Sequence, residues 1–208
     1  ILRDKDLAIS YDDLIDQSIG ALVKNSDISI TDESKTEVRI FFSERLRHFY
    51  INNGIAHDVF NAANTSDATV LSDLDARIKA TEDFKQQDYA KSLIEANKRA
   101  TNIVAKADVE INLYEQTVNP ELFESELETE LFNQIESMDS EFKQLVKDKH
   151  YGEAYRILAT LAEPLDAYFE NVMVNVDDET IRLNRLTQLE QVSRLTGSIA
   201  DLSQLVKG

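Results

Sequence analysis

The chain has 208 residues, and its 42% hydrophobic content is enough to bury a core, so disorder is not expected. With 39 acidic and 22 basic side chains its formal net charge is -17, a sign that repels polyanions at long range, so a nucleic-acid site must be a local basic cluster. The absence of Cys excludes disulfides and thiolate metal sites.

Glycine and proline are scarce, with five and two copies, and a sheet of many short strands would need more turns than they supply. We therefore expect an all-α fold. The sequence has neither an apolar run of membrane-spanning length nor a signal-peptide pattern, so we expect a cytoplasmic protein without a membrane partner. It begins with Ile1 instead of Met, and we interpret it as a piece of a longer protein.

The N-terminal third is expected to form a small helical segment. Ser10 is a candidate cap for a short amphipathic helix, and Thr31 begins a longer, aromatic-rich helix that ends near Gly54. The polar residues 64–67 mark the expected domain boundary. The predicted domains are a helical segment over residues 1–66 and a larger helical bundle over residues 67–208.

Two further helical stretches occupy the middle of the chain. Residues 72–106 have a helical pattern with an expected break near 86–88. Asn119 as a cap and Pro120 at the first helical position predict the start of a helix that ends near Lys149. We interpret the Glu-rich outer face of this last helix as solvated.

Residues 151–205 are expected to organise the fold as an apolar helix, a joint at 173–178 and a second helix. Pro164 should kink or restart the first helix, because proline lacks the backbone donor. Arg182 and Arg185 make the buried side of the second helix cationic near the joint, which suggests a ligand-binding lip. The apolar stripe that this helix must bury is Leu183, Leu186, Leu189, Val192, Leu195, Ile199 and Leu202.

Catalysis is not expected from these residues. The dipeptide His57–Asp58 supplies two ligands in metal-dependent phosphohydrolases, but His48 and His150 do not stand where they would complete such a site. An acid in the first turn of a helix is the simpler interpretation of Asp58. No glycine-rich phosphate loop is present. We expect no catalytic residue, metal or cofactor in this chain.

Two clusters have the residue types that hold phosphates and base edges of single-stranded nucleic acid. The structural alternatives are helix pairs four residues apart, Arg99 with Glu95 and Arg182 with Asp178, and periodicity alone favours these alternatives. The first cluster, the basic strip, is Lys98, Arg99, Asn102 and Lys106. The second, the joint cluster, contains Asn171, Met173, Asn175, Arg182 and Arg185.

Nearly the whole chain resembles the C-terminal region of the β subunit of bacterial glycyl-tRNA synthetase. The most specific segment is FENVMVNVDDETIRLNRLTQL, within residues 161–192. The last half is also similar to the DALR anticodon-binding domain of arginyl- and related synthetases. The other matching segments are KRATNI (98–103), VNPELFE (118–124), FFSERLRHFYINNGIAHDVFNAA (41–63) and ARIKATEDF (76–84).

The resemblance implies a DALR-like helical bundle that recognises the anticodon of glycine tRNA. It also implies a partner α subunit that carries the glycine and ATP chemistry, in an α2β2 enzyme that uses ATP and Mg, with residues 1–66 belonging to the preceding body of the β subunit. It adds Asn184 to the joint cluster. The alternative is an acidic helical scaffold that docks the α subunit or assembles the enzyme without touching the anticodon. An exposed apolar patch would favour that alternative.

Overall fold

The computed structural model describes residues 9–25, 29–66, 68–108 and 112–206. Within these ranges the regular structure is helical and contains no strand beyond an isolated bridge between Ser10 and Val70, which confirms the all-α prediction. The elements are α1 (Tyr11–Asn25), α2 (Asp32–Asn52), α3 (His57–Ala63), α4 (Leu71–Lys85), α5 (Ala90–Ala105), η1 (Leu113–Glu115), η2 (Pro120–Leu122), α6 (Glu126–Lys147), α7 (Tyr151–Ala159), α8 (Ala162–Asn171), α9 (Glu179–Gly197) and η3 (Leu202–Gln204).

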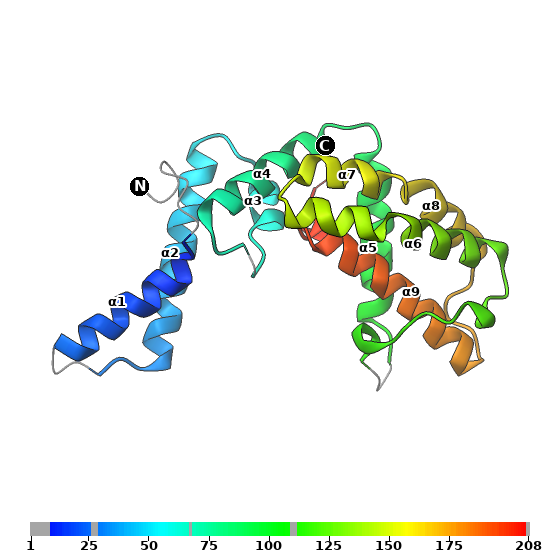
Figure 1. The fold of residues 1–208 in the computed structure, drawn as a ribbon, viewed down its shortest axis with the longest axis horizontal. Coiled ribbons are helices and arrows are strands. Elements are labelled where there is room, and N and C mark those ends of the chain that lie inside the picture. The colour runs from blue at the N-terminus through cyan, green and yellow to red at the C-terminus, as the bar shows by residue number, and fades with distance from the viewer. Residues whose placement is uncertain (1–8, 26–28, 67, 109–111, 207–208) are drawn as a thin grey trace.

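Helices α1 and α2 form a hairpin that projects from one end of the bundle (Figure 1). Arg39 of α2 forms ion pairs with Asp12 and Asp16 of α1, and the Tyr11 ring lies 5.0 Å from that of Phe42. No residue of α1 is fully buried. The hairpin therefore adds little to the core and leaves much of its apolar surface open.

That open surface is extensive. Between the two helices lies an apolar groove of about 390 Å³, with Leu14 and Ile19 in its lining. Leu22, Ile40 and Phe41 are each more than half exposed. Apolar surface gathered on one projecting element is typical of an interaction site.

The main core continues across the predicted boundary between residues 66 and 67. Phe60 of α3 is 2% exposed and belongs to the same hydrophobic cluster as the bundle residues. Helix α3 packs on α4 and on η3, and the Asp201 backbone N–H donates to the Ala62 carbonyl at 2.8 Å. Helix α3 therefore shares its packing with the bundle, and the boundary at 66/67 stays a prediction.

Of two helix starts that the sequence predicted, the structure confirms the one at Pro164 and contradicts the one at Asn119. The cap at Asn119 and Pro120 begins only the short η2, whereas the long helix α6 starts at Glu126 behind the capping box of Ser125 and Glu128, so the predicted start was wrong. Pro164 lies in the first turn of α8, where its missing N–H costs nothing, so it restarts the helix as expected.

The prediction of a break near 86–88 is confirmed, because α4 ends at Lys85 and α5 begins at Ala90.

Helix α9 crosses α5 in the view of Figure 1 and also packs on η1, η2 and α6. Its apolar stripe is buried as predicted, except that Leu183 is only partly covered. The helix stops at Gly197 instead of reaching Leu205, and η3 supplies the last buried leucines.

Asp58 of the His57–Asp58 dipeptide has a structural role. Asp58 accepts hydrogen bonds from Lys85 Nζ at 2.5 Å and from the Val206 backbone N–H at 2.7 Å. Burial raises the pKa of Asp58, but these hydrogen bonds outweigh it and hold the pKa below its ordinary value. No group of three or more potential metal ligands occurs among the described residues.

None of the helices in the described ranges has both the length and the apolarity needed to span a bilayer.

Candidate nucleic-acid interface

The predicted site residue Arg185 lies in a buried ion pair. Its side chain is 5% exposed and donates to Glu128 from Nε at 2.9 Å and from Nη2 at 3.1 Å. It also donates to Glu124 at 3.0 Å and to the Met173 carbonyl at 3.0 Å. The hydrogen bonds that Arg185 donates to the Glu128 carboxylate raise the pKa of Arg185. Arg185 therefore holds the joint to α6 and does not form the cationic lip that the sequence suggested.

Glu128 of α6 is fully buried. Beside the two bonds from Arg185, its carboxylate accepts the backbone N–H groups of Glu124 and Ser125 at 3.0 Å each. These four donors satisfy both oxygens of the buried carboxylate. Glu128 borders the apolar stripe of α6, and its ion-pair partner comes from α9, 57 residues further along the chain.

Asn184 is also a packing residue. Its Oδ1 accepts the Asn119 backbone N–H at 2.8 Å, and its Nδ2 donates to the Asn119 carbonyl at 3.0 Å. The side chain is 6% exposed, so both of its polar atoms are used to fix the segment before η2 against α9. We therefore leave Asn184 and Arg185 out of the interface proposed below.

The rest of the joint cluster is accessible. Asn171 and Asn175 are exposed, and Met173 is 72% exposed, which is unusual for methionine. Arg182 is partly exposed and lies 3.9 Å from Glu179. Its predicted partner Asp178 instead caps α9 by accepting the backbone N–H groups of Thr180 and Ile181, so that pairing was wrong.

The basic strip runs along α5 and is anchored on both flanks. Lys98 donates to the Leu205 carbonyl at 2.6 Å, while Arg99 donates to the Phe169 carbonyl at 3.1 Å and lies over the Phe169 ring at 4.6 Å. Asn102 and Lys106 are exposed at the end of the helix. The end of the strip therefore offers one amide and one ammonium group to a ligand.

The exposed parts of both clusters lie toward the same side of the bundle. In the view of Figure 1 the C-terminal end of α5 and the N-terminal end of α9 both point downward, and the segment from η1 to η2 runs along α9 between them. Arg99 links the clusters, since its partner Phe169 lies two residues before Asn171. The ends of α5 and α9 that carry Asn102, Lys106 and Arg182 therefore point to the same side of the bundle, which we call the exposed edge.

Sequence reasoning missed a polar cavity at this edge. It has a volume of about 370 Å³ and lies between helix α6, helix α9 and residues 114–118, which include most of η1. The Arg194 guanidinium lies over the Tyr114 ring at 5.0 Å, and Gln191 also lines the cavity. The helical pattern of α9 places Gln191 and Arg194 on its polar side and could have identified them as candidates. Tyr114 lies in a segment without regular periodicity, so no sequence pattern indicated it.

Comparison with known proteins agrees with this architecture. Residues 93–202, more than half of the chain, match the family described as the DALR anticodon binding domain. The chain is 34% identical over 210 residues to the glycine–tRNA ligase beta subunit of Aliivibrio fischeri strain MJ11, a match that covers 100% of this chain and 29% of the relative. The corresponding subunit of Colwellia psychrerythraea is 36% identical over 205 residues, covering 99% and 29%.

A third relative, the glycine–tRNA ligase beta subunit of Aliivibrio salmonicida, is 38% identical over 172 residues, covering 83% of this chain and 25% of the relative. The chain thus spans less than a third of the length of these relatives. The matched residues include α9, most of α5 and every helix between them, which together carry both clusters. On this evidence the chain belongs to the DALR anticodon-binding domain family.

Proposed function

We propose that this chain is the anticodon-recognising part of a glycine–tRNA ligase β subunit. The observation that carries the proposal is the family match over residues 93–202, the region that holds the exposed polar edge. The chain would hold the anticodon end of glycine tRNA while a partner α subunit attaches glycine to the acceptor end with ATP and Mg. Catalytic groups and cofactors would then belong to other parts of the ligase, which we propose acts in the cytoplasm.

The charges of the edge suit such a role. A chain with net charge -17 cannot attract RNA over long distances, so recognition must depend on a few local donors. Lys106 and Arg182 supply positive charge, and Asn102 and Asn175 supply amides that both donate and accept hydrogen bonds. Few phosphate contacts predict a shallow dependence of affinity on salt.

The test is binding of the 208-residue chain to a fluorescently labelled stem-loop with a glycine anticodon, measured at two salt concentrations. We expect tighter binding than to the same stem-loop with a different anticodon. The double variant Lys106→Ala, Arg182→Ala should weaken binding of both loops and reduce the salt slope by roughly one unit for each lost phosphate contact.

Lys143→Ala is the matched control, because Lys143 is an exposed lysine of α6, 70% exposed and paired with Asp139. It should bind both stem-loops as the wild type does. Equal, weak binding of the two anticodons by the wild type would contradict the proposal. Loss of affinity on Lys143→Ala comparable to that of the double variant would show only non-specific attraction.

The second candidate function is a scaffold that docks the α subunit, and the α1–α2 hairpin is the observation that favours it. Its groove is almost wholly apolar in its lining, and Phe41 remains 62% exposed. In this case an α subunit should co-elute with the chain in size-exclusion chromatography, and Phe41→Asp together with Leu22→Asp should abolish co-elution without changing anticodon binding.

A further inference from the structure

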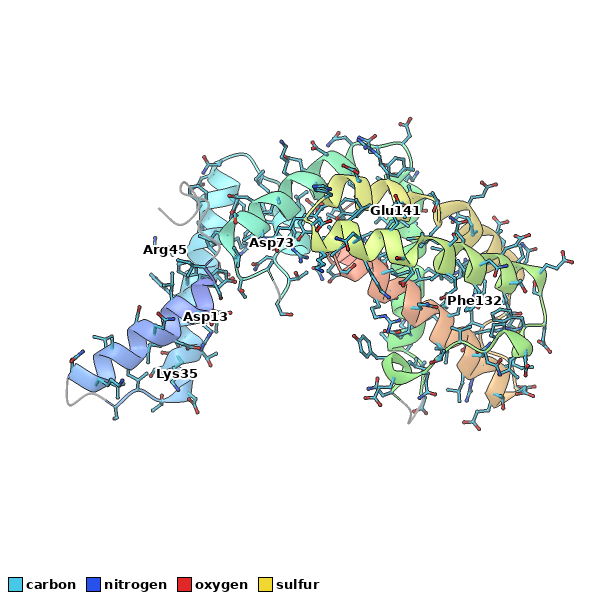
Figure 2. All side chains as sticks on the ribbon, viewed as in Figure 1. Asp13, Lys35, Arg45, Asp73, Phe132 and Glu141 are labelled. Carbon is cyan, nitrogen blue, oxygen red and sulfur yellow. The ribbon has the colours of Figure 1, made fainter. Side chains whose placement is uncertain are left out.

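The cavity beside the exposed edge has the dimensions of a small-ligand site. Its volume of about 370 Å³ falls within the range of small-molecule pockets. Apolar contact comes from Val118 and from Phe132, which Figure 2 labels where α6 faces α9. The complete lining is Tyr114, Glu115, Gln116, Thr117, Val118, Phe132, Glu136, Thr187, Glu190, Gln191 and Arg194.

The charges around the cavity exclude a phosphate and favour a hydrogen-bond donor. Glu115, Glu136 and Glu190 line it against the single cation Arg194. Carboxylates repel phosphate groups but accept hydrogen bonds from the exocyclic amine of a base. Burial raises the pKa of Glu190, and Arg194 offsets only part of that rise.

Gln191 has an unused polar atom at this place. Its Oε1 is buried and has no hydrogen-bond partner among the described residues. A buried acceptor without a partner is unfavourable, and a ligand that donates to it removes that cost. A glutamine amide both donates and accepts, which is the property used to read the edge of a base.

Tyr114 and Arg194 provide a flat surface at the mouth. The Tyr114 ring is 61% exposed even with the Arg194 guanidinium 5.0 Å from its centroid. Unpaired bases stack on aromatic rings and on guanidinium planes. Phosphate-binding sites do not need an exposed aromatic ring, so this pair distinguishes a base from an anion.

The place of the cavity connects it to the proposed interface. Tyr114 lies eight residues after Lys106, and the segment that carries it continues along α9 to Asn119, which is bonded to Asn184 near the joint. RNA that contacted both Lys106 and Arg182 would pass over this segment.

We propose that the cavity receives one unstacked base of the anticodon loop that carries an exocyclic amine beside a ring acceptor, as cytosine and adenine do. Tyr114 and Arg194 stack on the base, while Gln191 and Glu190 bond its edge. This inference rests on the proposed function and names the residues that would determine which anticodon base is accepted.

The experiment combines protein variants with modified RNA. The probes are glycine anticodon stem-loops, each lacking the base of a different loop nucleotide, and binding is measured for the wild type and for Tyr114→Ala. We expect one abasic position to weaken wild-type binding about 10-fold, the loss typical of one stacking contact. Tyr114→Ala should lose about as much on the unmodified loop and nothing further on that abasic loop.

Edge recognition has its own readout. Replacing the amine of the same base by a carbonyl oxygen should weaken wild-type binding. Gln191→Leu should distinguish the two loops less than the wild type does, because only Glu190 then bonds the amine. Phe41→Ala is the control for loss of an exposed aromatic ring, because Phe41 is 62% exposed and lies on the projecting hairpin. It should bind every loop as the wild type does.

The outcomes separate the two proposals. If the wild type prefers the glycine anticodon but Tyr114→Ala and Arg194→Ala bind like the wild type, the cavity is not the base site and the proposed function stands. If the loss of binding free energy caused by Tyr114→Ala adds fully to the loss caused by each abasic position, Tyr114 contacts no loop base and the inference is overturned. If the wild type does not distinguish anticodons, the proposed function fails and this inference fails with it.

Discussion

The buried pair of Arg185 and Glu128 gives the sharpest stability prediction. Arg185→Ala removes a side chain that is 5% exposed and leaves the fully buried Glu128 carboxylate with only two backbone donors. Removing one partner of a buried ion pair typically costs about 3–5 kcal/mol. For a chain of this size each kcal/mol lowers the melting temperature by about 2–4 °C, so we expect a decrease of about 6–20 °C.

Arg182→Ala is the matched control, three residues away on the same helix. Arg182 lies 3.9 Å from Glu179, whose side chain is 77% exposed, and such a surface pair contributes about 0–1 kcal/mol. Both variants are measured by thermal unfolding followed by circular dichroism at neutral pH. Similar melting temperatures for the two variants, with Arg185→Ala within about 1 kcal/mol of the wild type, would refute the assignment of Arg185 to the fold.

The double variant Arg185→Ala, Glu128→Gln tests the pair directly. Glutamine retains an acceptor for the backbone N–H groups of the capping box while it removes the stranded charge. The double variant should therefore be more stable than Arg185→Ala alone. This result also bears on RNA binding, since a loss of binding by Arg185→Ala would reflect unfolding of the joint.

Three further variants test other parts of the fold. Asp58→Asn should destabilise the chain at neutral pH through loss of the ion pair with Lys85. The pKa of Asp58 in the folded state lies below its ordinary value of 3.8, so this stabilisation is lost as the pH falls through the folded pKa. The difference in unfolding free energy between variant and wild type, measured by urea unfolding, should therefore vanish at the lowest pH. Gly54→Ala, at φ +93°, should lower stability by about 1 kcal/mol in urea, whereas Gly152→Ala, with open space around its Cβ and no positive φ, should not. Tyr155→Phe leaves the buried Thr81 hydroxyl without its partner at 2.8 Å and should lower the free energy of unfolding by about 1–2 kcal/mol in the same assay. No measurable change would show that the Thr81 hydroxyl finds another partner.

Much of the helical architecture was predictable because it depends on local periodicity. The stripe of α9, the break between α4 and α5 and the restart at Pro164 all follow from neighbours within a few residues. The start of α6 was misplaced because Asn119 and Ser125 are both good caps, and tertiary contacts decide between them.

The site was predictable only in part, for a physical reason. Residue type and spacing identify Arg182 and Arg185 equally well as cations near the joint, yet one is partly exposed and the other is buried against Glu128. The difference lies in a contact between residues 57 positions apart, which periodicity does not contain. The cavity at Tyr114 depends on similar long-range contacts, with 80 positions between Tyr114 and Arg194.

The residues around η3 have a consequence for the order in which the chain matures. Leu202 and Leu205 are fully buried, Lys98 donates to the Leu205 carbonyl, and the Val206 N–H donates to Asp58. During synthesis α3 and α5 are therefore made long before the segment that covers them. Until that segment leaves the ribosome, the apolar faces of both helices stay open to chaperones and to aggregation, so this part of the core cannot close before residues 202–206 have been made.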